Sequence, residues 1–171
     1  MREIPLTQGK VTLVDDEDYE ALIAFKWRTW SNRRGAWYAI SSLQRPKRTT
    51  LLMHAYIMGT VGMGHRITVD HIDNDGLNNQ RSNLRQANMH QQNCNKRKCH
   101  GTSSSFKGVS WHKIRRKWQA NIQFEGRLMY LGLFDSEVDA AHAYDLAAEI
   151  YFGPFAKTNL GDLSAVQIAA R

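Results

Sequence analysis

The stretch Trp118-Gln119-Ala120-Asn121-Ile122-Gln123 alternates strictly between apolar and amide side chains. Successive side chains of a β-strand point to opposite faces of a sheet, so this alternation predicts a strand with one packed face and one polar face. Glu125 and Gly126 then form a turn into a second predicted strand, residues 127–134. The sequence therefore predicts a β-hairpin whose outer face presents amide groups.

A helix is expected directly after this hairpin. Ser136 is a good helix N-cap, and Asp139 stands three residues further on, as in a capping box. The helix is predicted to run to about Tyr151, and its many alanines permit close approach to a sheet. We therefore expect an α+β unit in which a small three-stranded antiparallel sheet packs on one helix. The residues close to one stripe of this helix are Val138, Ala141, Tyr144 and Ala148.

The N-terminal part has weaker patterns. Lys10–Val14 alternates as a strand and is followed by a predicted short helix, and two β-rich runs, 26–30 and 36–40, suggest a hairpin. The apolar run 51–58 predicts a second helix that ends at Gly59. From Val69 to Asn95 polar turn-forming residues dominate, which indicates a long loop between short elements.

The charge of the chain favours a polyanionic partner. The 171 residues have a formal net charge of +7 and a sequence pI of about 9.6, and Glu125 is the only acidic residue from Cys94 to Arg127. A positive field of this kind attracts nucleic acid through counterion release. The absence of a long apolar run or signal peptide argues against a membrane partner and predicts a cytoplasmic protein.

The cysteines and histidines do not form a convincing zinc motif. Four residues separate Cys94 from Cys99, and no second pair of cysteines exists, whereas structural zinc sites favour two well-separated halves. His90 and His100 lie nearby and keep zinc open as a minor alternative. Two cysteines suit a reducing compartment and do not suggest a disulfide framework.

Several short motifs lie between Phe106 and Leu160. They are Phe106-Lys107-Gly108-Val109, Lys117-Trp118-Gln119-Ala120, Tyr130-Leu131-Gly132-Leu133-Phe134-Asp135, Ala140-Ala141-His142-Ala143-Tyr144-Asp145 and, after Gly153, Ala156-Lys157-Thr158-Asn159. With these motifs the segment resembles the ethylene-response-factor, or APETALA-type, DNA-binding domain. The resemblance implies double-stranded DNA as the partner, with the sheet in the major groove. It covers about a third of the chain.

The candidate DNA-binding residues are polar or basic side chains of this predicted sheet and its turns. Amide side chains can bind adenine edges, and lysine or arginine can bind phosphates. A solvated basic hairpin is the alternative for residues 113–117. Ser110, His112 and Leu128 replace arginines of the plant pattern, so base preference cannot be transferred. The candidates are Lys107, Ser110, His112, Lys113, Arg115, Arg116, Lys117, Gln119, Asn121, Gln123, Arg127 and Tyr130.

A second set of motifs combines carboxylate, imidazole and amide groups. It consists of Asp70-His71-Ile72-Asp73, Leu77-Asn78-Asn79, Ser82-Asn83-Leu84-Arg85 and Asn93. In order and spacing this set resembles the phage-type HNH endonucleases, whose core is the ββα-metal, or His-Me finger, fold. An Asx-rich loop, in which these side chains only satisfy backbone donors, is the alternative.

The HNH resemblance implies a role for each matching residue. His71 would be the general base, and Asn83 would orient it. Asp70 and Asn93 would bind Mg²⁺ or Mn²⁺, with Gln92 and His90 as alternatives to Asn93. A cation that neutralises the scissile phosphate and a neutral imidazole that deprotonates water are the two roles that phosphodiester hydrolysis requires.

Together these motifs predict four segments. They are a ββα-metal nuclease domain with an N-terminal β/α segment (1–95), a basic and serine-rich linker (96–105), the DNA-binding domain (106–160) and a C-terminal tail (161–171). The leading expectation is a homing-type DNA endonuclease, a monomer or weak dimer, in a bacterial or phage-infected cell. In it the C-terminal sheet would choose the site of cleavage. The alternative is a DNA-binding regulator with an inactive nuclease domain.

Overall fold

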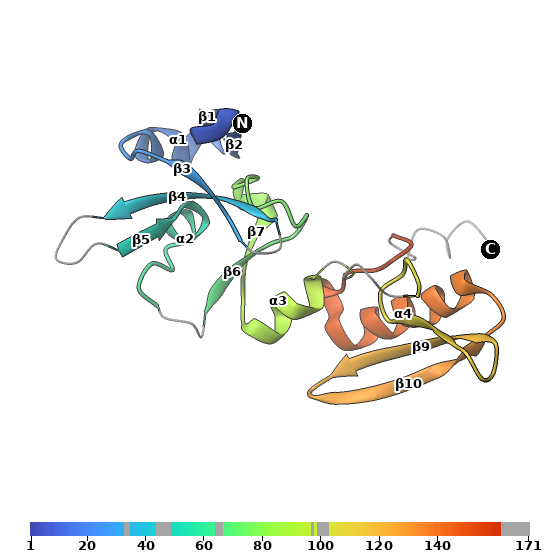
Figure 1. The fold of residues 1–171 in the computed structure, drawn as a ribbon. Helices are drawn as coiled ribbons and strands as arrows, with labels where there is room; N and C mark the ends of the chain where they lie inside the picture. The colour runs from blue at the N-terminus through green and yellow to red at the C-terminus, as the bar shows by residue number, and fades with distance from the viewer. Residues whose placement is uncertain (33–34, 44–48, 64–66, 97, 99–102, 162–171) are drawn as a thin grey trace, which may run out of the picture. The chain divides into compact units, whose positions relative to one another are not determined.

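The computed structural model describes residues 1–32, 35–43, 49–63, 67–96, 98 and 103–161. The chain combines helices with antiparallel sheets and divides into two compact units, unit 1 (Met1–Asn93) and unit 2 (Cys94–Arg171) (Figure 1). The division falls two residues before the end of the predicted domain 1–95. Residues 97 and 99–102 of the predicted linker, including Cys99, and residues 162–171 of the predicted tail lie outside the described residues.

Unit 1 contains a three-stranded antiparallel sheet in the order β3-β4-β5 and two two-stranded ladders, β1-β2 and β6-β7. Its strands are β1 (Arg2–Pro5), β2 (Val11–Val14), β3 (Arg28–Ser31), β4 (Trp37–Leu43), β5 (Thr49–Leu52), β6 (Thr68–His71) and β7 (Leu84–Ala87). Its helices are α1 (Asp16–Ile23) and α2 (Met53–Ile57), with short 3₁₀ turns at Thr7–Gly9 and Arg81–Asn83. Helix α3 (Met89–Asn95) follows β7.

The core of unit 1 forms where α1 and α2 pack against the strands. Val14, Leu22 and Met53 are fully buried, and Leu51 is 1% exposed. The long polar segment after β6 is attached to the first ladder, because Leu13 N donates to Leu77 O at 2.9 Å and Asn79 N donates to Leu13 O at 2.8 Å. The predicted helix 51–58 begins later than expected. Leu51 and Leu52 instead continue β5, where Leu51 pairs with Ser41.

Unit 2 has three strands and one long helix, and its second and third strands and the helix lie at the residues that the alternation, the turn and the cap predict. Strands β8 (Val109–His112), β9 (Lys117–Phe124) and β10 (Arg127–Phe134) form an antiparallel sheet in the order β10-β9-β8. Helix α4 (Glu137–Phe152) follows, and a 3₁₀ turn, Gly153–Phe155, ends it. Ser136 is the N-cap of α4, since its side chain accepts hydrogen bonds from the backbone of Val138 and Asp139.

Small residues allow α4 to lie close to the sheet. Ala140, Ala141 and Ala148 are fully buried, and the strand residues Ala120 and Ile122 are at most 1% exposed. This confirms that the apolar face of the alternating stretch is the packed one. The C-terminal end is held by the buried carboxylate of Asp145, which accepts hydrogen bonds from Asn159 and Leu160.

Ser104 shows that the end of the predicted linker is part of unit 2. This residue is 8% exposed, and its hydroxyl donates to Glu137 Oε1 of α4 at 2.7 Å. Ser105 N donates to the same carboxylate at 3.2 Å. No helix in the described part of the chain is long and apolar enough to cross a membrane.

Candidate functional site

The outer face of the unit 2 sheet displays the amide side chains of β9. Residues paired directly across an antiparallel ladder point to the same face. The ladder pairs Gln119 with Ser110, Asn121 with Tyr130 and Gln123 with Leu128. Leu128 is 72% exposed and Tyr130 is 60% exposed, in contrast to the buried residues that alternate with the amides. The face opposite α4 is thus open to a ligand.

A basic turn lies at the edge of this face. We use this name for Lys113, Arg115 and Arg116, which connect β8 to β9 and are all exposed. The turn is ordered by hydrogen bonds to His112, since Arg116 N donates to its carbonyl oxygen at 2.8 Å and Arg115 N donates to its Nδ1 at 3.2 Å. Three guanidinium or ammonium groups therefore lie next to the amide face. Such a cluster can bind phosphates along a nucleic-acid backbone.

Lys117 begins β9 on the same face as the amides, where it pairs with His112. Its Nζ lies 3.1 Å from the Asp135 carboxylate, so its charge is partly neutralised within unit 2. Lys117 therefore differs from the three cations of the basic turn.

Two predicted DNA-binding residues lie elsewhere. Lys107 Nζ donates to Cys94 O at 2.6 Å and lies 5.9 Å from the Tyr144 ring centre, and burial lowers the pKa of Lys107 to about 8. Arg127 is exposed but pairs with Phe124, whose ring packs against Tyr151 of α4 at 5.2 Å. Lys107 therefore belongs to the interior of unit 2, and Arg127 belongs to the side of the sheet that faces the helix.

In unit 1 the predicted metal ligand Asp70 forms an ion pair with Arg85. Arg85 donates to Asp70 Oδ2 through Nε at 2.9 Å and through Nη2 at 2.8 Å. Both side chains are largely covered, with exposed fractions of 17% for Arg85 and 11% for Asp70. A charge-assisted pair of this geometry occupies one carboxylate oxygen and places a guanidinium where a cation was expected.

His71, the predicted general base, is buried and bound to Asn79. Its Nε2 lies 3.3 Å from Asn79 Oδ1, and Asn79 Nδ2 donates to Thr12 Oγ1 at 2.8 Å. Because the Asn79 amide nitrogen is directed at Thr12, its oxygen must accept from His71, so Nε2 bears the proton of the neutral ring. Burial, the largest influence, lowers the pKa of His71, while the Asn79 hydrogen bond and neighbouring aspartates oppose the shift.

Asn83 was expected to orient His71, but Asn79 does so in the structure. Asn83 Oδ1 accepts from Asp73 N at 3.0 Å, and its Nδ2 donates to Asp73 Oδ1 at 2.9 Å and to Asn78 O at 2.8 Å. These contacts close the loop between β6 and β7. Asn79 is fully buried, but nothing in its local pattern distinguishes it from the neighbouring asparagine, so its role was not predictable from the sequence.

The residues proposed for a second metal ligand lie on α3. Gln92 Nε2 donates to Val69 O at 3.0 Å, while His90 and Asn93 lie on either side of it. Among the described residues there is no group of three or more His, Cys, Asp or Glu side chains that could hold a metal ion. With Arg85 bound to Asp70, these side chains do not fit a divalent cation as they are arranged here. Mg²⁺ or Mn²⁺ binding stays a prediction.

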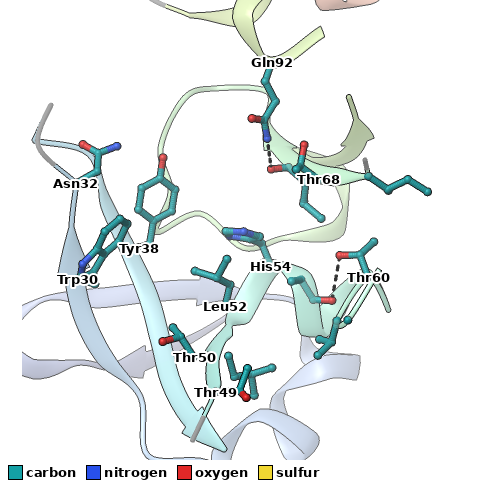
Figure 2. Close-up of a pocket in the computed structure, with 16 residues that line it drawn as sticks. Trp30, Asn32, Tyr38, Thr49, Thr50, Leu52, His54, Thr60, Thr68 and Gln92 are labelled. Atoms are coloured by element: carbon teal, nitrogen blue, oxygen red, sulfur yellow. Dashed lines mark hydrogen bonds between the residues drawn. The ribbon is translucent and has the colours of Figure 1, made fainter. Parts of the chain in front are cut away.

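Unit 1 also contains a cavity of about 470 Å³ that the sequence did not indicate. Figure 2 shows Trp30 and Tyr38 on one side of it, with His54 between Tyr38 and Thr60. The described residues that line it include no Asp, Glu, Lys or Arg. His54 is 8% exposed, and burial lowers its pKa to about 3, so its ring is neutral at neutral pH. The His54 and His71 rings meet edge to face, with their centres 5.0 Å apart.

Comparisons with known proteins find relatives among plant transcription factors. The chain is 52% identical over 59 residues to APETALA2-like protein 2 of Oryza sativa, which is 33% of this chain and 13% of that protein. It is 46% identical over 65 residues to dehydration-responsive element-binding protein 2A of Oryza sativa, which is 37% of this chain and 23% of the relative. It is 37% identical over 67 residues to the AP2-like ethylene-responsive transcription factor ANT of Arabidopsis thaliana, which is 33% of this chain and 12% of the relative.

These matches span less than a quarter of each relative's length. The matched lengths are close to that of the segment 106–160, where the sequence resembled this class of domain. No protein-family model and no solved structure matches the chain. The pairwise matches thus establish that about a third of the chain is similar to APETALA2-like and ethylene-responsive (AP2/ERF-type) proteins.

The expectation that this chain is an HNH endonuclease is wrong. Among the relatives compared, those whose names state a function are ethylene-responsive transcription factors and a dehydration-responsive element-binding protein, and none of these names describes a nuclease or other hydrolase. The more specific expectation of a homing or phage enzyme, with His71 and Asn83 in catalysis, depended on the endonuclease and no longer applies. The relatives named above are plant proteins, so they lend no support to a bacterial or phage-infected cell as the location.

Proposed function

We propose that this chain is a DNA-binding regulator whose unit 2 binds double-stranded DNA through the outer face of its sheet. The observation that supports this most is the separation of the two sheet faces. One face is closed by α4, and the other presents Gln119, Asn121 and Gln123 beside the basic turn. The similarity of about a third of the chain to plant transcription factors supports the same function.

The two parts of the surface would make different contributions to binding. The basic turn would bind phosphates, which gives affinity without sequence preference and makes that affinity depend on salt. The amide groups of β9 would contact base edges, which gives preference between sequences. The B-DNA major groove admits a two-stranded β-ribbon, and β9 with β10 forms a hairpin of this kind.

We further propose that β6, β7 and α3 form a ββα module that has no nuclease activity in this chain. The ion pair between Asp70 and Arg85 supports this, because it occupies one oxygen of the carboxylate that such a module needs for a metal and places a positive charge beside it. In this proposal unit 1 is a folded companion of the DNA-binding unit. A monomer or weak dimer stays a prediction.

DNA binding can be tested by fluorescence anisotropy of the full chain with a labelled 20-base-pair duplex. We expect the logarithm of Kd to rise linearly with the logarithm of KCl concentration between 50 and 200 mM, with a slope that counts the phosphate contacts. No binding at the lowest salt concentration would refute the proposal. Incubation of supercoiled plasmid with the protein and Mg²⁺ or Mn²⁺ tests the second part. Cleavage that a chelator abolishes would show that unit 1 is not inactive.

A further inference from the structure

Amide and apolar side chains are paired across the exposed face of β9 and β10. The ladder places Gln123 opposite Leu128 and Asn121 opposite Tyr130. Directly opposed residues of an antiparallel pair have Cβ atoms about 5 Å apart. Leu128 is 72% exposed, and Gln123 is exposed beside it. The face thus offers a hydrogen-bonding group and a hydrocarbon group within one small area.

This pairing matches the major-groove edge of an A·T base pair. Adenine presents the N7 acceptor and the N6 donor, which one Asn or Gln amide can bind together, and thymine presents a C5-methyl group that favours apolar contact. Guanine presents two acceptors, N7 and O6, which are bound most often by arginine or lysine. The chemistry of a sheet face therefore indicates which base pair it prefers.

Cations suitable for guanine are scarce on this part of the sheet. Arg115 and Arg116 lie in the turn between β8 and β9, and Arg127 has the strand orientation of Phe124, on the side that faces α4. Of the arginine and lysine residues in β8, β9 and β10, Lys117 shares the face of the amides, and its ammonium group is paired with Asp135 at 3.1 Å.

The amides of β9 are also ordered relative to one another. Gln119 Nε2 donates to Asn121 Oδ1 at 3.1 Å. This hydrogen bond directs the oxygen of Asn121 toward Gln119 and its Nδ2 away from it. An amide held in one orientation presents its donor and acceptor in a fixed arrangement, which reduces the entropy lost when it binds a base.

We propose that the outer face of the unit 2 sheet prefers A·T base pairs, with Gln123 or Asn121 binding adenine N6 and N7 and Leu128 contacting the thymine methyl group. The inference rests on the proposed DNA-binding function and adds a base preference to it. Tyr130, opposite Asn121, contributes apolar surface next to the same site. The basic turn binds phosphates equally well in any sequence and contributes nothing to this preference.

Selection from a library tests the preference. The full chain is mixed with duplexes that contain a randomised 12-base-pair centre, and the bound fraction is recovered and sequenced. We expect A·T pairs to be enriched at two or more adjacent positions, and the selected duplex to bind about tenfold more tightly than one with G·C at those positions. Retention of duplexes with no enrichment, or enrichment of G·C pairs, would overturn the inference while leaving the DNA-binding function intact. If no duplex were retained, the proposed function would fail as well.

The contact to the thymine methyl group can be tested on the selected duplex. Deoxyuridine in place of thymidine removes only that methyl group, and we expect it to weaken binding by the parent protein about fourfold, the effect of losing one buried methyl group. Leu128→Ala should bind the thymine and uracil duplexes equally well. Val138→Ala removes a comparable exposed apolar side chain on α4 and should keep the full discrimination. Equal discrimination by Leu128→Ala and the parent would exclude Leu128 as the group that contacts the methyl.

Discussion

The two units use polar residues in opposite ways. In unit 1 the polar motif around Asp70 and His71 is satisfied internally, by Arg85 and Asn79. In unit 2 the amide side chains of β9 lie on the face that α4 does not cover, and the residues opposite them are exposed. The density of polar residues in a sequence therefore does not identify the surface that meets a ligand. Their orientation relative to a packed face is the better guide.

Gly108 provides the largest test of this division. Its φ is +76°, and a Cβ there would lie 2.0 Å from Tyr144 Cδ2 and 2.7 Å from Asn121 O. Gly108→Ala should therefore destabilise unit 2 by about 3 kcal/mol or more, through overpacking and backbone strain together. Gly126 has a similar φ of +77° with nothing within 4 Å, so Gly126→Ala should cost only about 1 kcal/mol of strain. Urea unfolding followed by tryptophan fluorescence measures both losses, and equal losses would contradict the packing argument.

Gly76 is the matching position in unit 1. A Cβ at Gly76 would lie 2.3 Å from Trp37 O, so Gly76→Ala should destabilise unit 1 to an extent similar to that of Gly108→Ala in unit 2. DNA affinity should be lost in Gly108→Ala under conditions that unfold its unit 2. It should be retained in Gly76→Ala, whose unit 2 remains folded under the same conditions. Loss of binding in both variants would mean that the DNA surface depends on unit 1.

Acid should distinguish the units next, because two histidines, His54 and His71, are buried in the described part of unit 1. The pKa of His54 is about 3 in the folded chain and about 6.5 in the unfolded one, so only the unfolded chain binds the proton between these values. The free energy of unfolding should therefore fall as pH falls from 6.5 toward 3, by up to about 1.4 kcal/mol per pH unit. The pKa of His71 is also lowered and adds to the loss.

Melting temperatures at pH 7 and pH 5 test this dependence. Between these pH values the Tm of His54→Gln should fall less than the Tm of the parent. His142, on the exposed surface of α4, is the control, and His142→Gln should keep the parent's pH dependence. An unchanged pH dependence in His54→Gln would show that its neutral form does not stabilise unit 1.

Local patterns predicted unit 2 better than unit 1. The alternation of residues 118–123 and the cap at Ser136 act over a few positions, and strand β9 and helix α4 form at those residues. Residues 51–58 look helical locally, but Leu51 forms a strand because it pairs with Ser41, ten residues earlier. Such long-range pairing has no sequence signature.

The site was predictable to the same limited degree. The orientation of Gln119, Asn121 and Gln123 followed from alternation alone, and the structure agrees with it. The partners of Asp70 and His71 lie 15 and 8 residues away. Both stand in the quoted motifs, but the motifs do not show which side chains pair. The family resemblance implied that Lys107 contacts DNA, yet its ammonium group binds the Cys94 carbonyl.

The basic turn gives a smaller, electrostatic test. Replacing Arg115 and Arg116 by Gln should weaken DNA binding about tenfold near physiological salt and lower the salt slope by about one for each lost phosphate contact. The double variant Lys26→Gln and Arg28→Gln removes the same charge from exposed positions of unit 1 and should leave the slope unchanged. If both double variants lowered the slope equally, net charge and not the turn would govern binding.

The smallest effect concerns how each unit holds the start of a helix. Ser136 Oγ accepts from Val138 N at 3.2 Å and Asp139 N at 3.4 Å, so Ser136→Ala should cost about 1 kcal/mol and Ser136→Thr should restore most of it.

Asp15, the N-cap of α1, makes no such bond, and its carboxylate instead accepts from Arg81 N at 2.7 Å. Asp15→Ala should therefore speed amide exchange at Arg81, while Ser136→Ala should speed exchange at Val138 and Asp139 within its own first turn. Hydrogen exchange at these amides distinguishes a side chain that caps its own helix from one that binds a backbone amide far along the chain. Faster exchange in the first turn of α1 alone would show that Asp15 acts as an ordinary cap, and that the two units do not differ in this respect.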